Sequence, residues 1–250
     1  MDLQLEGAVA VVTGASRGLG AAAAAALAGE GARVVAAARS TGALEELAAG
    51  SDGRIHPVRC DMRDAGEVAG LTGVAVERFG RLDCVVNNAG IAPAGAFLDQ
   101  DPAVLSDVVA VNVLAPAILS QAAGRHFVAG GVAGSIINIG STSSLKGKPL
   151  LAAYSASKGA LARLTEALAA EWARYSIRVN MIAPGAFATE AQAQVLADER
   201  MLAARLRKIP MRRMGEPAEL GPLVCYLASP LAAFVTGSCF VIDGGEVSKL

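Results

Sequence analysis

Hydrophobic residues along the chain gather in short runs that are separated by longer segments of helical composition. Seven runs rich in Val, Ile and Ala are predicted to be strands, at residues 8–14, 32–38, 55–60, 82–88, 134–140, 177–183 and 238–244. Most positions within each run are apolar, which is typical of strands covered by helices on both faces of a sheet. The alternation of these runs with helical segments predicts an α/β fold with a parallel sheet joined by crossover helices.

The segment after the first predicted strand carries a clear helix signal. Residues 19–31 include six consecutive alanines, Ala21 to Ala26. Alanine favours helix, and its small side chain lets a helix approach a sheet closely. Gly29 and Gly31 follow the alanines and predict the end of the helix and the return to the next strand.

Length and composition indicate one domain. The chain has 250 residues, of which 53% are hydrophobic, and a formal net charge of −1. This is enough for one large core, so residues 1–250 are predicted to form a single domain. Within it, residues 187–214 have no strand pattern and carry much of the positive charge. They fit either an ordinary pair of surface helices or a mobile lid that binds substrate.

Charge and composition also exclude several partners. No run of Lys and Arg is present, which argues against nucleic acid binding. The first residues lack the pattern of a signal peptide, and no run approaches the roughly 20 uncharged residues that span a membrane. We therefore expect a cytoplasmic protein without a membrane partner. The scattered cysteines predict buried free thiols and no metal site: Cys60, Cys84, Cys225 and Cys239.

A glycine-rich loop joins the first predicted strand to the alanine helix. Its sequence, TGASRGLG, contains Gly14, Gly18 and Gly20. Glycines at such a turn permit positive φ and close approach of a ligand, and the helix N-terminus offers unpaired N–H groups to a pyrophosphate. A purely structural turn is the alternative. Because both the strand and the helix are predicted around it, the loop favours a dinucleotide site.

The end of the second predicted strand bears on the choice of dinucleotide. NAD-selective sites carry an acidic residue there that binds the adenosine ribose. This chain has Ala38 at that position, followed by Arg39, and Arg17 lies in the glycine loop. An uncharged residue beside arginines leaves room for a 2′-phosphate and pairs with it, so NADP(H) is preferred over NAD(H).

Asp61 follows the third predicted strand and has two interpretations. Its carboxylate is placed to accept a hydrogen bond from the adenine amino group. Alternatively, Asp61 caps the helix that is predicted to begin near Asp64. The sequence leaves both open.

Tyr154 and Lys158 stand four residues apart in a segment of small and apolar residues. On a helix they share one face, so they act on the same small volume. A neighbouring ammonium favours the phenolate and is expected to lower the high pKa of Tyr154, which gives a tuned acid/base. Ser141, thirteen residues earlier at a strand end, is placed to hydrogen-bond the same substrate oxygen.

Asn112 is a polar residue within the apolar helical stretch DVVAVNVLAP. It is either a core amide with all its hydrogen bonds satisfied, or an amide that bends or hydrates the helix and connects Lys158 to solvent protons. The residues alone do not separate these interpretations.

Taken together, these motifs resemble the classical short-chain dehydrogenase/reductase family over essentially the whole chain. TGASRGLG matches the glycine motif of the family, NNAG at residues 87–90 its fourth-strand motif, APGAFAT its nicotinamide segment and DGG its last turn. Asn112, Ser141, Tyr154 and Lys158 match its catalytic tetrad. The resemblance implies a Rossmann-type fold with strand order 3-2-1-4-5-6-7 and reversible hydride transfer between a nicotinamide and a carbonyl or alcohol.

The resemblance also implies roles for individual residues. Tyr154 would be the general acid/base, Lys158 would lower its pKa and hold the nicotinamide ribose, Ser141 would position the carbonyl, and Asn112 would support the proton relay. Gly90 would line the adenosine ribose. The implied dinucleotide site comprises Gly14, Ser16, Arg17, Gly18, Leu19, Gly20, Arg39, Ser40, Asp61, Met62, Asn88, Ala89, Gly90, Tyr154, Lys158, Pro184, Gly185, Phe187 and Thr189, of which Thr189 and the backbone near Phe187 would hold the carboxamide.

The substrate is less well defined by the sequence. Its site should be lined by residues 93–97, 143–151 and 187–214, which are apolar with a few positive charges if Lys146 and Lys148 point inward. A small or medium ketone, sugar, polyol or other metabolite is expected. The alternative of a 3-oxoacyl-carrier-protein reductase is weakened because Val132 and Tyr175 stand where such relatives often carry basic residues.

Two further expectations come from the same resemblance. Some proteins of this fold bind a dinucleotide as sensors or scaffolds without catalysis, but they lose tetrad residues that this chain keeps. The family resemblance also implies a homotetramer or a dimer. One interface would use the tyrosine helix and its predecessor, and the other the last helix and strand.

Overall fold

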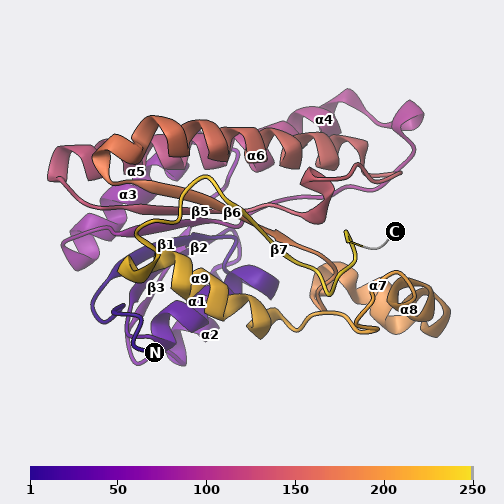
Figure 1. The fold of residues 1–250 in the computed structure, drawn as a ribbon, viewed down its shortest axis with the longest axis horizontal. Coiled ribbons are helices and arrows are strands. Elements are labelled where there is room, and N and C mark those ends of the chain that lie inside the picture. The colour runs from indigo at the N-terminus through magenta and orange to yellow at the C-terminus, as the bar shows by residue number, and fades with distance from the viewer. Residues whose placement is uncertain (249–250) are drawn as a thin grey trace.

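The computed structural model describes residues 1–248 and contains one parallel sheet with helices on both faces (Figure 1). The strand order is β3-β2-β1-β4-β5-β6-β7. The strands are β1 Val9–Thr13, β2 Arg33–Ala38, β3 Ile55–Arg59, β4 Cys84–Asn87, β5 Ser135–Ile139, β6 Arg178–Pro184 and β7 Cys239–Ile242. Each predicted run coincides with one of these strands to within two residues at either end, so the predicted fold class and strand order are confirmed.

Helices form a layer on each side of the sheet. They are α1 Gly18–Gly29, α2 Thr41–Ala49, α3 Ala65–Phe79, α4 Pro102–Val109, α5 Ala115–Gly130, α6 Ala152–Trp172, α7 Ala193–Ala197, α8 Glu199–Leu206 and α9 Gly221–Ala228. Helices α3, α5 and α6 cover one face, and α1, α2 and α9 cover the other (Figure 1). A parallel sheet needs both layers because each of its faces is apolar.

The order of the strands reverses in the middle of the sheet. The chain moves outward from β1 through β2 to β3 and then returns, so that β4 pairs with β1 on its other side. The loops that follow β1 and β4 therefore diverge, which leaves a crevice at the carboxyl ends of these strands. Both the glycine loop and the NNAG motif lie at this reversal.

The hydrophobic core has two parts, one on each face of the sheet. Val12, Leu27 and Val224 are fully buried between the sheet and the α1–α9 layer. Phe127 and Leu119 are fully buried on the other side. Every residue of β1, β4, β5 and β6 is buried, which explains why these strands appear as nearly continuous apolar runs in the sequence.

The alanine helix is confirmed as α1. A Cβ added to Gly221 of α9 would lie 2.7 Å from Cβ of Ala26, so the backbones of α1 and α9 approach closely. Gly29 is the last residue of α1, and Gly31 follows it with a φ of +90°, a conformation that favours glycine. The predicted stop and return to β2 are therefore confirmed.

A chain of buried side-chain hydrogen bonds ties β4 and β5 to the helices above them. Nδ2 of Asn87 donates to Oγ of Ser120 at 3.1 Å and to Oδ1 of Asn138 at 2.8 Å. Nδ2 of Asn138 donates to Oγ1 of Thr165 on α6 at 2.8 Å. Buried polar groups stabilise a fold only when they are paired. This chain thereby fixes the position of α6, which carries Tyr154.

Residues 187–214 form no strand, as predicted, and contain the two short helices α7 and α8. A single β-bridge joins Phe187 to Gly215. Ala186, Ile209 and Met214 form a small buried cluster of their own that fastens both ends of the segment. The segment thus has the form of a helix pair, and its movement as a lid stays a prediction.

The helical region Pro102–Gly130 corrects one expectation from the sequence. It runs through α4 and α5 without a break for 29 residues, and its most apolar 18-residue stretch has a mean hydropathy of 1.9, which is enough, by length and composition alone, to cross a membrane. A count of uncharged residues stops at Asp107 and Arg125, whereas mean hydropathy averages across them. Core helices pass the same test, and this one packs against α3, α6 and β4.

Candidate active site

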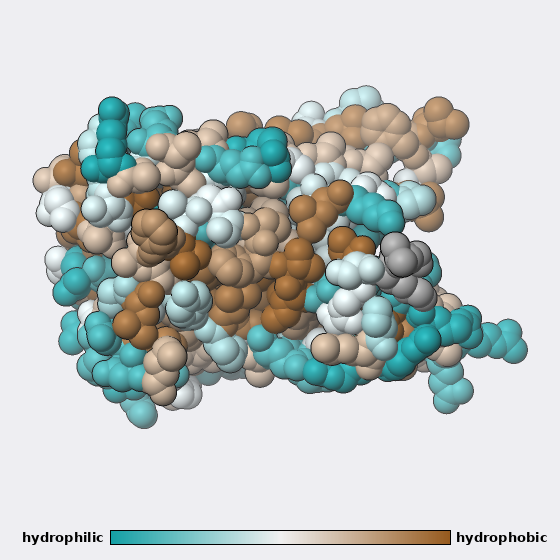
Figure 2. Space-filling model, viewed as in Figure 1, coloured by the Kyte–Doolittle hydropathy of each residue, from teal (hydrophilic) through white to brown (hydrophobic). Residues whose placement is uncertain are grey.

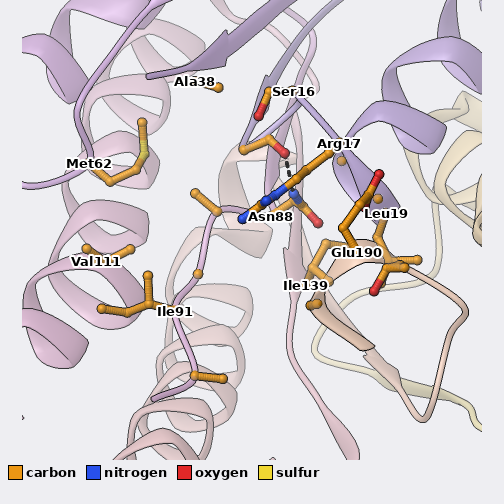
Figure 3. A pocket seen from close by; sticks show the side chains of 18 of the residues that line it. Ser16, Arg17, Leu19, Ala38, Met62, Asn88, Ile91, Val111, Ile139 and Glu190 are labelled. Carbon is orange, nitrogen blue, oxygen red and sulfur yellow. Dashed lines mark hydrogen bonds between the residues drawn. The ribbon is translucent and has the colours of Figure 1, made fainter. Parts of the chain in front are cut away.

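A cavity of about 770 Å³ opens at the carboxyl ends of the central strands, where the strand order reverses (Figure 3). It is lined by residues that follow β1, β2, β4 and β5, by the end of β6 and by one face of α6. Every residue predicted to bind the dinucleotide lines this cavity except Phe187. Of the predicted catalytic residues, Ser141, Tyr154 and Lys158 line it, and Asn112 lies buried behind its wall.

The glycine loop forms one wall of the cavity. Its backbone conformation and close contacts leave no room for side chains at its three glycines. Gly14 and Gly18 have φ values of +65° and +58°. A Cβ added to Gly20 would lie 2.2 Å from the carbonyl oxygen of Gly14 and 2.4 Å from Nδ2 of Asn88. Since α1 begins at Gly18, the unpaired N–H groups of its first turn lie at the cavity.

The NNAG motif is locked to the end of β1 through Thr13. Oγ1 of Thr13 accepts hydrogen bonds from the backbone N–H groups of Asn88 at 3.0 Å and Ala89 at 3.1 Å. Nδ2 of Asn88 donates to the carbonyl oxygens of Thr13 at 2.9 Å and Gly14 at 3.2 Å. Asn88 and Ala89 therefore shape the glycine loop as well as line the cavity. Sequence analysis missed Thr13, whose signal was a polar residue at a buried strand end.

Arginines stand at the end of the cavity formed by β2. Ala38 is buried, and Arg39 and Ser40 after it are exposed. Figure 3 shows the side chain of Arg17 extended across the cavity towards Asn88. Within the described residues 1–248, neither Arg17 nor Arg39 pairs with a carboxylate. Both guanidinium groups are therefore available to an anion.

Asp61 lines the cavity but does not cap α3. Its Oδ1 accepts a hydrogen bond from the backbone N–H of Arg63 at 3.0 Å. The cap is Asp64, whose Oδ1 accepts from the N–H groups of Gly66 and Glu67. The capping interpretation of Asp61 is therefore wrong, since a residue three positions later is closer to the first turn. Its contact with adenine stays a prediction.

Tyr154 and Lys158 lie on one face of α6 and both line the cavity, as their spacing predicts. Nζ of Lys158 lies 5.9 Å from the centre of the Tyr154 ring. It donates a hydrogen bond to the carbonyl oxygen of Ile139, at the end of β5, at 2.8 Å. Lys158 is buried, so its ammonium is held at a fixed point beneath the phenol.

The electrostatic effect expected of this pair is not present in the protein alone. Burial raises the pKa of Tyr154, and a hydrogen bond with Ser141 acts in the opposite direction. Burial also lowers the pKa of Lys158 to about 8. Desolvation penalises both charged forms, so the phenolate is not favoured by the ammonium as the sequence suggested.

Ser141 follows β5 and begins a short 3-10 helix at Thr142–Ser144. Its Oγ accepts a hydrogen bond from the backbone N–H of Ser143 at 3.0 Å. The hydroxyl of Ser144 bonds to the carbonyl oxygen of Ser141. The turn therefore orients the Ser141 hydroxyl so that its own proton remains for Tyr154 or a substrate oxygen.

Asn112 lies in a wide π turn at Ala110–Leu114 between α4 and α5 and is completely buried. Its Oδ1 accepts from the N–H of Ile91 at 2.9 Å, and its Nδ2 donates to the Ile91 carbonyl at 2.9 Å and to Oγ of Ser157 at 3.0 Å. The amide is thus satisfied, and the helix is also distorted at this residue. Asn112 is therefore both a core amide with its hydrogen bonds satisfied and a residue at which the helix is distorted. Its part in a proton relay from Lys158 stays a prediction.

Gly90 lies between Asn112 and Lys158. A Cβ on Gly90 would lie 3.4 Å from Oδ1 of Asn112 and 3.5 Å from Nζ of Lys158. Gly90 is therefore at the Lys158 end of the cavity. Because Gly90 has no side chain, a ligand in the cavity can reach Nζ of Lys158.

The last residue of β6, Pro184, lines the cavity, as do Gly185 and Thr189 after it, but Phe187 does not. Phe187 is buried, and a Cβ on Gly215 would lie 2.8 Å from its ring, which lines a separate cavity. Its carbonyl oxygen accepts the N–H of Thr189 at 2.9 Å. The side chain of Phe187 thus turns towards Gly215, and the predicted contact of its backbone with the carboxamide stays a prediction.

Glu190 is a lining residue that sequence analysis missed. Figure 3 shows its side chain in the cavity near Leu19. A Cβ on Gly18 would lie 3.6 Å from its Oε2. An isolated acidic residue in a charged segment carries no sequence signal for such a position.

Replacing Lys158 with Met should stabilise the protein at pH 7 by about 1–2 kcal/mol, since it removes a buried charge at the cost of one hydrogen bond. The pKa of Lys158 falls from 10.5 to about 8 on folding, so its ammonium opposes folding most below pH 8. The stability of the wild-type protein therefore recovers as pH rises from 8 to 10.5. Urea unfolding at pH 7 and pH 10 would check this, and a Met variant that is less stable at pH 7 would contradict it.

Comparisons with known proteins agree with this architecture. A family model described as "Enoyl-(Acyl carrier protein) reductase" matches residues 14–246. The chain is 38% identical to 2-dehydro-3-deoxy-D-gluconate 5-dehydrogenase of Escherichia coli (strain K12), over 98% of this chain and 97% of that protein. A Sinorhizobium meliloti structure provisionally named as a short-chain alcohol dehydrogenase superposes with a TM-score of 0.95 and 39% identity, covering 100% of both chains.

A second solved structure is similar along almost the whole chain. It is an Agrobacterium tumefaciens protein provisionally named as a 2-deoxy-D-gluconate 3-dehydrogenase, with bound NADP. It has a TM-score of 0.92 and 33% identity, and 99% of each chain is covered. These similarities show an NAD(P)-dependent oxidoreductase that acts on the CH–OH group of its donors. The chain belongs to the classical short-chain dehydrogenase/reductase family.

Proposed function

We propose that this protein is an NADP(H)-dependent oxidoreductase that interconverts a ketone and a secondary alcohol, with Tyr154 as the general acid/base. One observation carries the proposal: a single cavity joins the glycine loop at Gly18 to the cluster of Ser141, Tyr154 and Lys158. A phosphate-binding loop at one end and two hydroxyls beside a buried ammonium at the other suit a dinucleotide that reacts with a polarised carbonyl.

The residues present fit a dinucleotide. Gly14 and Gly18 adopt positive φ, which brings their backbone to the cavity surface. A Cβ added to Gly18 would lie 3.4 Å from the side chain of Thr189, so it would occupy space that a ligand needs. The first turn of α1 presents N–H groups to a pyrophosphate. When bound, NADP(H) supplies or accepts the hydride. Gly90, beside Nζ of Lys158, would then contact the nicotinamide half of the dinucleotide instead of the adenosine half expected from the sequence.

Ser141 and Tyr154 have different roles at the substrate oxygen. The Ser141 hydroxyl, fixed by the N–H of Ser143, donates a hydrogen bond that holds the carbonyl. The Tyr154 hydroxyl gives its proton to this oxygen during reduction and takes it back during oxidation. Burial disfavours the resulting phenolate in the protein alone, so the proposal requires the positive charge of an oxidised nicotinamide, next to the Lys158 ammonium, to lower the pKa of Tyr154.

Asn112 acts as a positioning residue in this proposal. It holds both the N–H and the carbonyl of Ile91, which follows Gly90 directly. It also bonds Ser157, whose Oγ donates to the backbone carbonyl of Tyr154 at 2.7 Å. Asn112 thereby links the wall of the cavity to the helix that carries the acid/base.

The unpaired arginines support NADP(H) as the preferred dinucleotide. Ala38 leaves the end of β2 without the acid that would bind a ribose diol and repel a phosphate. Arg39 and Arg17 are free to pair with a 2′-phosphate. The NADP found in the similar Agrobacterium structure is consistent with this preference.

The Arg39→Ala variant should raise KM for NADPH about 10–50-fold and leave KM for NADH nearly unchanged, because a charge-assisted bond to the 2′-phosphate is lost. Steady-state kinetics with both dinucleotides would measure this. Arg33→Ala is a matched control, since Arg33 is an exposed arginine at the opposite end of β2. Equal effects on NADPH and NADH would contradict the proposed preference.

We infer that the substrate is a polyhydroxy ketone or alcohol, with a sugar acid as the first candidate. The support is the activity named for the Escherichia coli relative, a dehydrogenase of a dehydro-deoxy-gluconate. The acyl-carrier-protein alternative has less support. Val132 is apolar, and the ring of exposed Tyr175 lies against Arg174 at 4.7 Å. The alternative of a non-catalytic sensor gains no support, since all four residues that match the catalytic tetrad lie in or against the cavity.

Three further features belong to the proposal. The 187–214 segment would cover the bound substrate. The chain would assemble as a homotetramer through the α5–α6 face and through the edge strand β7, where Figure 2 shows hydrophobic residues. Val241 of β7 and Phe234 in the loop before it are exposed. Its location would be the cytoplasm.

The test of this function is NADPH oxidation by the purified protein with a panel of carbonyls. The panel should contain keto-sugar acids, neutral keto-sugars, simple ketones and an acyl-thioester β-ketone. Turnover of the first two groups would support the proposal. Turnover restricted to the thioester would replace it with the acyl-carrier function. Tight NADPH binding without turnover of any member would favour the sensor.

A further inference from the structure

Lys148 lies in the loop between Ser141 and Tyr154 and is held in place along its length. Its backbone N–H donates to Oγ of Ser155 on α6 at 3.3 Å, and its carbonyl accepts the N–H of Leu151 at 3.2 Å. Its Nζ donates to Oγ1 of Thr142 at 2.9 Å. The side chain is half-buried, so this lysine turns inward, unlike the exposed Lys146 two residues earlier.

The ammonium of Lys148 has no carboxylate partner within ion-pair distance in the described part of the chain. The nearby acids are engaged elsewhere. Glu246 forms a double hydrogen bond with Arg205 of α8, at 2.6 and 2.7 Å. Asp243 accepts from the N–H groups of Gly245 at 2.8 Å and Val247 at 2.7 Å.

The surroundings of Lys148 therefore leave a positive charge unbalanced. Arg205 and Lys208 act on it from the 187–214 side, and Glu246 and Asp243 from the C-terminal side. Burial is the largest influence and lowers the pKa of Lys148. A half-buried ammonium whose hydrogen-bond partner is a neutral hydroxyl gains most from an incoming anion.

The ammonium of Lys148 is connected to the reacting centre through Thr142, although neither residue lines the cavity that holds Ser141 and Tyr154. Thr142, which contacts Nζ, is the neighbour of Ser141 in the chain. In a six-carbon sugar acid with its ketone at C5, four C–C bonds separate the ketone from the carboxyl carbon, a span of about 5 Å. Figure 2 shows the surface hollowed between the α4 side of the molecule and the α7–α8 segment, where such a chain would enter.

We propose that Lys148 forms an anion subsite that binds the carboxylate of the substrate while Ser141 and Tyr154 hold its carbonyl. The inference rests on the proposed function and deepens it, because it selects acids over neutral sugars. The carboxylate would replace or share the Thr142 hydroxyl as partner of Nζ. Lys148 is thus a specificity-determining residue outside the catalytic tetrad.

The test compares two substrates that differ only at the carboxylate, 5-keto-D-gluconate and L-sorbose, by NADPH-dependent reduction. In wild type we expect kcat/KM to favour the acid. Lys148→Met should reduce kcat/KM for the acid about 10–100-fold, mainly through KM, and leave L-sorbose nearly unchanged. Lys148→Arg should retain most of the preference. Lys146→Met, which removes an exposed charge from the same loop, should change neither substrate.

Several results would overturn the subsite. They are a wild-type protein with no preference for the acid, a Lys148→Met variant that loses both substrates equally, and a Lys146→Met variant with the same loss as Lys148→Met. An equal loss would mean that Lys148 only supports the loop through Thr142.

A binding measurement separates this inference from the proposed function. Calorimetry with D-gluconate and D-glucitol, in the presence of NADP⁺, needs no turnover. Preferential binding of gluconate by wild type that is lost in Lys148→Met supports the subsite. Equal binding of the two compounds overturns it even if ketones are reduced. Absence of any ketone reduction, with gluconate bound through Lys148, contradicts the proposed function alone.

Discussion

Replacing Tyr154 with Phe is expected to lower kcat by about 10²–10⁴-fold, the usual contribution of a positioned acid/base. The change removes one hydroxyl and keeps the ring that packs above Lys158. The hydroxyls of Ser141 and Thr189, which also line the cavity, are aliphatic and much weaker acids than a phenol, so water would have to supply the proton. The measurement is single-turnover NADPH oxidation with the best ketone of the panel.

The variant should bind NADPH almost as well as wild type, since the phosphate loop lies at the other end of the cavity. Fluorescence titration of NADPH would establish this. Tyr175→Phe is the matched control: Tyr175 is 40% exposed, and its loss should leave kcat unchanged. A Tyr154→Phe variant with more than about a tenth of the wild-type rate would show that another group transfers the proton.

Replacing Gly20 with Ala should weaken NADPH binding by at least about 100-fold, because the glycine loop cannot keep its shape. The new Cβ would lie 2.2 Å from the carbonyl oxygen of Gly14, which is backbone and cannot rotate away. It would also displace Nδ2 of Asn88, and with it the bonds that Asn88 makes to Thr13 and Gly14. Titration with NADPH measures the loss.

Gly29→Ala controls for the substitution itself. Gly29 is the last residue of the same helix, and a Cβ there would meet nothing within 4 Å. This variant should bind NADPH normally and be equally or slightly more stable. If Gly20→Ala were to bind NADPH as tightly as Gly29→Ala, the glycine loop would not be the phosphate site. Circular dichroism of both variants would show whether the fold is retained.

Much of the site was predictable because its signals are local. Gly14, Gly18 and Gly20 occupy a single turn, and their positive φ values or crowded positions follow from contacts within a few residues and the adjoining strand. Tyr154 and Lys158 share a helical face through spacing alone. These features depend on backbone sterics and helix periodicity, which a short stretch of sequence already determines.

The errors and omissions involve groups whose surroundings come from distant segments. Asn112 bonds Ile91 and Ser157, which lie 21 and 45 residues away, so its partners are not apparent from the stretch around it. Phe187 turns out of the main cavity because Gly215 leaves room for its ring on the other side. Asp61 was open to two interpretations until Asp64 was seen to cap α3.

The electrostatics show the same division. The sequence places an ammonium beside a phenol and predicts a lowered pKa for Tyr154, but it does not show how far each group is removed from water. In the folded protein, burial raises the pKa of Tyr154 and lowers that of Lys158 to about 8. Desolvation depends on the packing of the whole molecule, so no local pattern reveals it.

By itself, the sequence determined the parallel α/β architecture, the glycine loop, the four residues that match the catalytic tetrad, and Arg39 beside Ala38. Only the tertiary structure decided that Lys148 turns inward to Thr142 while Lys146 stays exposed, and that the nearby acids are already paired. The physical reason is one of range. Periodicity and backbone conformation act over a few residues, whereas side-chain direction, burial and charge balance arise where distant segments meet.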